Sequence, residues 1–155
     1  MLQYLGILAA CGAVAGGAAL GGWWLARRRR QRLAAARKLF HQRREWLEAR
    51  FVELASASGK PRGLRWKECD FSDAVTFARD RQTGGLTALA AVTISFEAIE
   101  GEGMEEVEAV GNLRAATAVF QYGAGQWSTQ GRAIMNLEPA EAIQRFHRAL
   151  ESIGD

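Results

Sequence analysis

The sequence predicts an α+β fold in which two helical segments precede a curled antiparallel sheet of about five strands and a C-terminal helix. Three observations support this prediction. Residues 2–26 are uncharged and mostly apolar. Apolar residues then recur with a helical period as far as residue 57. From residue 63 onward they alternate with a period of two, as they do in strands with one buried face.

The composition limits the classes of protein that this chain can belong to. Its 155 residues suffice for one modest domain and an appendage. Two cysteines exclude a disulfide-rich scaffold, and five Trp with seven Phe exclude a wholly disordered chain. The predicted parts are an anchor over residues 1–26, a basic amphipathic helix over 27–57 and an α+β domain over 58–155.

Charge is distributed unevenly among these parts. The net charge of +3 combines an uncharged N-terminal stretch with two segments of opposite sign. Residues 27–50 hold ten Lys or Arg against two Glu, whereas residues 51–155 hold ten against fifteen Asp or Glu. A basic segment directly after an uncharged run is the pattern that flanks membrane spans on their cytoplasmic side.

Residues 2–26 predict a transmembrane helix, because about 20 apolar residues are enough to cross the hydrocarbon core. Tryptophan rings favour the headgroup layer, and basic residues hold their end of a span in the cytoplasm. The predicted membrane flank comprises Trp23, Trp24, Arg27, Arg28, Arg29, Arg30 and Arg32. We therefore expect a single-pass signal anchor in the inner (plasma) membrane, with the N-terminus outside and the C-terminal domain cytoplasmic.

Two other interpretations of the N-terminus remain open. A cleaved signal peptide carries positive charge before its apolar run, and no basic side chain precedes Arg27. Residues 8–11, Leu-Ala-Ala-Cys, resemble a bacterial lipobox, which would lipidate Cys11 and export the domain. The short apolar stretch before Cys11 and the long one after it favour the anchor instead.

Small residues repeat at every fourth position of the anchor, at Ala9, Ala13, Gly17 and Gly21. Such a row lets two membrane helices approach closely. It predicts a homo-oligomer formed through this face, although Gly and Ala are frequent in membrane helices in any case.

Residues 27–57 predict a helix, since they contain neither Pro nor Gly and are rich in Ala, Arg, Leu and Glu. Apolar residues spaced by seven give it one apolar face: Leu33, Phe40, Leu47 and Leu54. We expect the distal half of this face to pack on the sheet, because arginines interrupt the second column that a coiled coil requires.

We consider two interpretations of the basic face of this helix. It is best explained as a solvated flank that also touches anionic lipid headgroups. Nucleic-acid binding is the other, but the arginine density falls with distance from the anchor and no known nucleic-acid module follows. We therefore expect no nucleic-acid partner.

The clearest strand covers residues 86–99, where every second residue is apolar. Four more strands are predicted at 64–71, 74–80, 114–122 and 126–137, with Gly-containing hairpin loops at 81–85 and 123–125. A terminal helix begins at Pro139 with an apolar stripe of Ile143, Phe146, Leu150 and Ile153. Cystatin-like and NTF2-like folds share this plan, as an analogy of fold only.

Six glutamates crowd residues 97–108, where Gly101 and Gly103 predict a loop. The candidate interaction loop comprises Glu100, Glu102, Glu105, Glu106 and Glu108. We expect these acids to be solvated and to dock on a basic partner. If the sheet curls, polar strand residues line a pocket, and its candidates are Asp70, Glu97 and Arg132.

No catalytic or nucleotide-binding motif is present. Two His and two Cys do not supply the ligand spacing of a zinc site, and Cys69 is expected to be a buried thiol on the same side of its strand as Phe71. We therefore expect neither metal nor cofactor. The leading hypothesis is a non-enzymatic membrane-anchored scaffold or adaptor, and the alternative is a membrane-tethered NTF2-like domain with a small-molecule or catalytic pocket.

Overall fold

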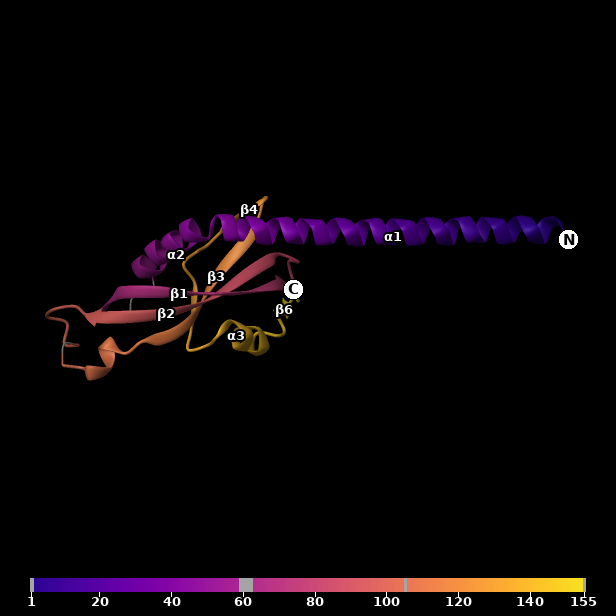
Figure 1. Cartoon of the computed structure of the whole chain (residues 1–155). Helices are drawn as coiled ribbons and strands as arrows, with labels where there is room; N and C mark the ends of the chain where they lie inside the picture. Colours follow the sequence, from indigo (N-terminus) through magenta and orange to yellow (C-terminus); the bar gives the residue numbers. More distant parts are fainter. Residues whose placement is uncertain (1, 59–62, 105, 155) are drawn as a thin grey trace. The chain divides into compact units, whose positions relative to one another are not determined.

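The computed structural model describes residues 2–58, 63–104 and 106–154, excepting the side chains of residues 2–19 and 109. The chain forms two compact units, Met1–Leu39 and Phe40–Asp155, which we call the N-terminal unit and the C-terminal unit. The fold is α+β, with two N-terminal helices, a six-stranded antiparallel sheet and a short helix near the C-terminus (Figure 1).

Helix α1 (Leu2–Gln42) forms the N-terminal unit and enters the C-terminal unit with its last residues. Within the part of the chain whose side chains are described, no helix is long and apolar enough to cross a membrane. Ala9, Cys11, Ala13 and Gly17 lie outside the residues with described side chains. A Cβ added at Gly21 would meet nothing within 4 Å.

Helix α2 (Arg44–Ser58) continues the chain after a turn at Arg43, whose backbone N–H donates to the carbonyl of Phe40 at 3.1 Å. The sequence predicts the end of this helix correctly, but not the break before it. Leu47, Phe51 and Ala55 are buried on one face of α2. The packing expected for the distal half of the basic helix is therefore confirmed.

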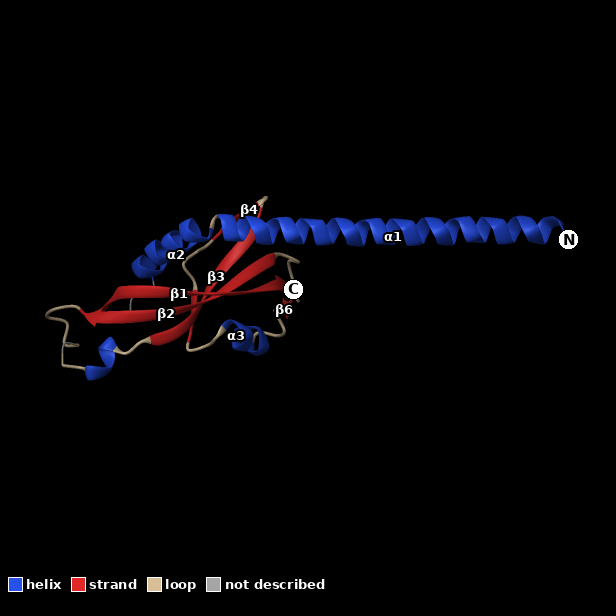
Figure 2. Ribbon diagram, viewed as in Figure 1, coloured by secondary structure: helices blue, strands red, loops and turns tan. Residues whose placement is uncertain are grey.

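The strands are β1 (Leu64–Asp80), β2 (Leu86–Ala98), β3 (Arg114–Gly123), β4 (Gln126–Ser128), β5 (Ala133–Met135) and β6 (Leu150–Ser152). They follow the order β4-β3-β2-β1-β6, and β5 pairs with β3 beside β4. The sheet is open rather than curled, which corrects the prediction. Helices on opposite sides cover its two faces, α2 on one and α3 (Pro139–Arg145) on the other, so the sheet need not close on itself to bury them (Figure 2).

Three predicted elements differ from the observed ones. Residues 64–71 and 74–80 form one strand. The apolar alternation changes phase at two register shifts, Trp66/Glu68 and Phe71/Val75, but the pairing with β2 continues through both. Residues 126–137 contain two short strands rather than one. The terminal helix ends at Arg145, and residues after it join the sheet as β6.

The end of the chain shows why the helical stripe was misleading. Leu150 pairs with Asp80 in β1, and the N–H of Ile153 donates to the carbonyl of Phe77 at 3.0 Å. Backbone hydrogen bonds to a strand edge replace those of a helix at these positions. Apolar residues spaced by three and four positions also occur by chance in a segment this short. The spacing alone therefore cannot distinguish a helix from a strand here.

An aromatic cluster fills the core of the C-terminal unit between the sheet and the helical residues on one of its faces, Phe40 at the end of α1 and Phe51 in α2. The ring of Phe40 lies 5.4 Å from that of Phe120 and 5.0 Å from that of Trp127. Phe51 contacts Phe71 in β1 at 5.7 Å. On the opposite face, Ala78, Leu89 and Ile143 form a smaller buried cluster. These two layers fix the positions of the loops and edges that carry the polar features.

Candidate functional site

The predicted membrane flank lies along α1 in the N-terminal unit, and all of its side chains are exposed. The side chains of Trp23 and Trp24 are 59% and 52% exposed. The guanidinium of Arg27 lies 5.3 Å from the ring centre of Trp23, and that of Arg28 lies 4.7 Å from the ring centre of Trp24. Each pair is spaced by one helical turn, which places the cation over the aromatic ring.

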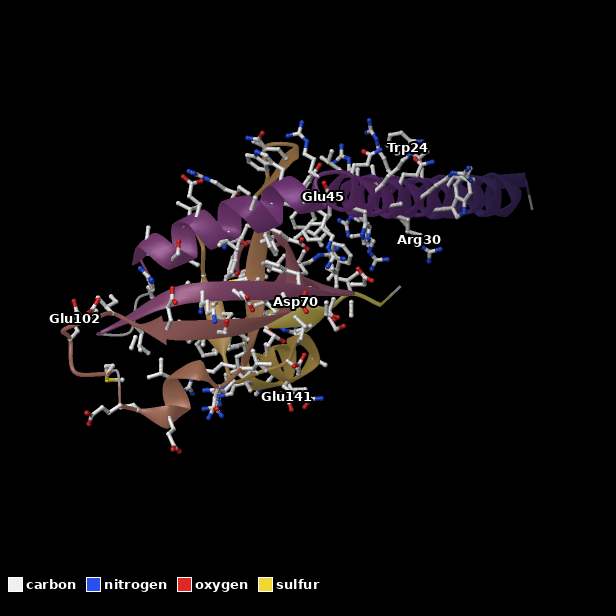
Figure 3. All side chains as sticks on the ribbon, turned by 60° about the vertical axis from the view of Figure 1, so that its left-hand side comes forward. Trp24, Arg30, Glu45, Asp70, Glu102 and Glu141 are labelled. Carbon is white, nitrogen blue, oxygen red and sulfur yellow. The ribbon has the colours of Figure 1, made fainter. Side chains whose placement is uncertain are left out.

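Two shallow hollows open beside these stacked pairs. One of about 240 Å³ is lined by Trp23, Trp24, Arg27, Arg28 and Gln31. The other, of about 220 Å³, is lined by Trp23, Ala26, Arg27 and Arg30. Figure 3 shows Trp24 and Arg30 projecting from this part of α1. The helix therefore combines cationic groups with aromatic walls in one short segment.

The acidic loop joins β2 to β3 and contains the 3-10 turn η1 (Glu108–Gly111). Its exposed carboxylates are those of Glu100, Glu102, Glu106 and Glu108, whereas Glu105 lies outside the described residues. Gly101 and Gly103 have φ values of +82° and +76°, which confirms the loop predicted at these glycines. Glu102 lies at the far end of the loop in Figure 3.

Internal contacts define the conformation of this loop. Val110 is buried, and the N–H of Val107 donates to the carbonyl of Met104 at 3.2 Å. A Cβ added at Gly63 would lie only 2.7 Å from Cγ of Met104, so the loop passes close to the beginning of β1. The described glutamates therefore lie on a loop that contacts the beginning of β1.

The structure does not bring the three predicted pocket residues together. Asp70 is exposed on β1, in register with Thr93. Glu97 forms an ion pair with Arg65 across β1 and β2. Arg132 lines a cavity of about 120 Å³ to which neither of the other two contributes.

This cavity lies between the sheet and the segment that follows α3, which contributes Phe146 and Ala149, and it adjoins a wider hollow of about 320 Å³. The two share Asp80, Thr87 and Gln121 among their lining residues, and we call them together the polar groove. Arg132 and Asp80 supply charges of opposite sign, while Leu89 belongs to the apolar lining.

A hydrogen-bonded turn directly after Asp80 positions its carboxylate at the polar groove. Its carboxylate Oδ1 accepts the backbone N–H groups of Thr83 and Gln82, each at 2.8 Å. Because the hydrogen bond from Thr83 and that from Gln82 stabilise the charged form, they lower the pKa of Asp80 below its usual 3.8. The sequence signal that was missed is an aspartate directly before a Gly-containing turn, which is typical of this arrangement.

Cys69 and His41 line neither the polar groove nor the hollows beside Trp23 and Trp24. Cys69 lies on the same face of β1 as Phe71, as predicted, and burial raises the pKa of its thiol to about 11. The thiol therefore stays protonated at neutral pH. His41 is exposed. Among the described residues, no three or more His, Cys, Asp or Glu side chains are grouped so that they could hold a metal ion.

No protein-family model, no curated protein and no solved structure matches this chain. Any functional assignment must therefore rest on the residues of the chain and their arrangement.

Proposed function

We propose that this protein is a single-pass membrane anchor that presents a small α+β interaction domain at the cytoplasmic face of the inner (plasma) membrane, as a non-enzymatic scaffold or adaptor. The observation that carries the proposal is the junction in α1, where the uncharged residues 2–26 meet five arginines within six positions. Charge of this kind directs its end of a span to the cytoplasm.

The exposed tryptophans support the same assignment. Trp23 and Trp24 stand between the uncharged run and the arginines, where an aromatic ring with a polar N–H suits the membrane interface. The row of small residues that ends at Gly21 has open space around its described member, so a second anchor can approach that position. Self-association through this face is part of the proposal.

The acidic loop is the proposed docking element of the C-terminal unit. Its exposed glutamates make it a strongly negative feature of that unit, and its conformation is maintained by Val110 and Met104. A basic protein surface complements it electrostatically, which raises association rates and selects partners of opposite charge.

Co-purification of the tagged full chain from detergent-solubilised membranes tests the adaptor role. The variant replaces Glu100, Glu102, Glu106 and Glu108 by Gln, and the control replaces Glu45 and Glu53, exposed acids on α2. We expect a stoichiometric protein partner that the control retains and the loop variant loses. Absence of such a partner, or its equal retention by both variants, would contradict the adaptor role.

The polar groove supports a second candidate function, a membrane-tethered domain that binds a small molecule. Among the described residues no carboxylate forms an ion pair with Arg132, whose guanidinium lines the polar groove together with the buried Leu89. A carboxylate ligand with a hydrogen-bond donor for Asp80 suits this lining. The test measures Tm of the full chain with free amino acids and 2-hydroxy acids, and only a rise that Arg132→Ala abolishes favours this function.

A further inference from the structure

We propose that the flank of α1 from Trp23 to Arg32 binds the headgroups of acidic phospholipids through its stacked Trp–Arg pairs. This inference rests on the proposed function, because it places these residues at the headgroup layer of the cytoplasmic leaflet. It adds the class of lipid that is bound and the atoms that recognise it.

The stacked pairs make the guanidinium groups suitable for a phosphodiester. The guanidinium groups of Arg27 and Arg28 lie over the rings of Trp23 and Trp24, and an aromatic face occupies none of the N–H donors of a guanidinium. The edge of a guanidinium donates two parallel hydrogen bonds to phosphate oxygens, which the ammonium of lysine cannot do. All five basic residues of the flank are arginines.

The hollows beside the pairs offer room for a headgroup. The hollow of about 240 Å³ has both tryptophans on its wall together with Arg27, Arg28 and the amide of Gln31. The adjacent one, of about 220 Å³, adds Arg30. Two neighbouring sites of this kind on one helix favour headgroups with net negative charge, since a zwitterionic headgroup brings an ammonium among the guanidinium groups.

The position of the flank along the helix agrees with this assignment. At about 1.5 Å per residue, the segment from Trp23 to Arg32 extends roughly 14 Å along α1. It begins directly at the end of the uncharged run, so its first turns lie at the depth of phosphates. Each basic residue close to an anionic surface contributes about 1 kcal/mol of attraction.

The test reconstitutes the full chain in vesicles of equal parts phosphatidylcholine and phosphatidylglycerol. The protein is then excised with its surrounding lipid by a styrene–maleic acid polymer, and mass spectrometry gives the ratio of the two lipids. We expect the ratio of phosphatidylglycerol to phosphatidylcholine to be about two- to fivefold higher than in the bulk. The double variant Arg27→Gln/Arg28→Gln should lose this enrichment, and Trp23→Ala/Trp24→Ala should reduce it.

The matched control is Arg43→Gln/Arg50→Gln, which removes the same charge from exposed positions of the chain beyond the flank. It should retain the enrichment, and an equal loss would show that net charge alone attracts the lipid and would overturn the inference. Equal lipid ratios for wild type and the flank variant would also overturn it. Nucleic acid that co-purifies with the wild type in place of phosphatidylglycerol would assign the flank to a different ligand.

Resistance of the reconstituted protein to alkaline carbonate distinguishes this inference from the proposed function. A chain that resists extraction but shows no lipid preference keeps its anchor and loses only the headgroup site. A chain that carbonate removes contradicts the anchor and, with it, the inference.

Discussion

Phe51 is the residue of α2 whose ring packs against aromatic side chains of the sheet. It is fully buried, and its ring lies 5.7 Å from that of Phe71 and 6.0 Å from that of Phe120. We expect Phe51→Ala to lower the free energy of unfolding by about 3–5 kcal/mol, because it removes apolar burial and leaves a cavity.

Urea denaturation of the full chain in detergent micelles measures this loss. The control is Trp46→Ala on the same helix, since Trp46 is 57% exposed. Its effect should stay within about 0.5 kcal/mol. Similar losses for the two variants would mean that α2 does not pack as described.

Asp80 determines how the β1–β2 turn responds to pH. Its pKa is lowered below 3.8 by the N–H groups of Thr83 and Gln82, so its folded pKa lies under its unfolded value. Such a group contributes stability that is present above the unfolded pKa and is lost as pH falls through the folded pKa. We expect the stability difference between wild type and Asp80→Asn to be constant near neutrality. It should shrink as pH falls from the unfolded pKa towards the lower folded pKa of Asp80.

Denaturation curves of the two proteins from about pH 7 to about pH 3 give this difference. Asparagine is the matched substitution, because it keeps the size of the side chain and one acceptor oxygen while the charge is removed. A difference that grows on acidification would have the wrong sign for a lowered pKa, and would contradict the described turn.

At the scale of elements, the loop before β5 is held against α2 at Gly131. This residue has φ +71°, and a Cβ added to it would lie 2.5 Å from the backbone N of Ala55 and 2.7 Å from Cβ of Leu54. Its N–H donates to Oγ1 of Thr129 at 3.1 Å, and that hydroxyl donates to the carbonyl of Val119. The loop therefore needs glycine for space as well as for conformation.

Two glycine-to-alanine variants separate these requirements. Gly84 has φ +70° with nothing near its added Cβ, so Gly84→Ala should cost only about 1–2 kcal/mol of backbone strain. Gly131→Ala should cost about 1–3 kcal/mol more, because α2 or the loop must move. Tm and urea midpoints of the full-length variants decide this, and equal costs would contradict the close approach.

Local patterns predict the elements well and their ends poorly. The alternation in β2 and the helical period of α2 follow from which side chains are buried, so both are visible in the sequence. The continuation of β1 through two register shifts and the pairing of β6 with β1 depend on partners distant in the sequence. Arg44 illustrates the same limit, because it donates to the carbonyls of Ser72 and Asp73 in β1 from the first turn of α2.

The candidate sites also differ in whether they depend on residues that are distant in the sequence. The proposed membrane flank is a continuous segment that composition and order alone can indicate, and its place at a membrane stays a prediction. The polar groove is assembled from the β1–β2 turn, β2, β3 and the segment that follows α3, together with the loop that holds Arg132. Of the three predicted pocket residues only Arg132 contributes to it, because the prediction assumed a curled sheet.

For the whole molecule, the central feature is the sequence of an uncharged run, an arginine-rich flank and a C-terminal unit in which acidic residues outnumber basic ones. We propose that this order gives the chain a direction with respect to a membrane, since basic residues are retained on the cytoplasmic side of a span. Replacing Arg27–Arg30 and Arg32 by Gln should weaken or invert that direction, while the C-terminal unit keeps its fold.

The most direct test is a topology measurement on the full chain, with a reporter after Asp155 that is active only in the cytoplasm, combined with carbonate extraction of the membranes. We predict a carbonate-resistant protein with an active reporter, and a reduced signal when the five arginines are replaced by Gln. A chain released by carbonate, an inactive reporter on the wild-type chain, or a signal unchanged by the five substitutions would contradict the anchored, cytoplasmic arrangement.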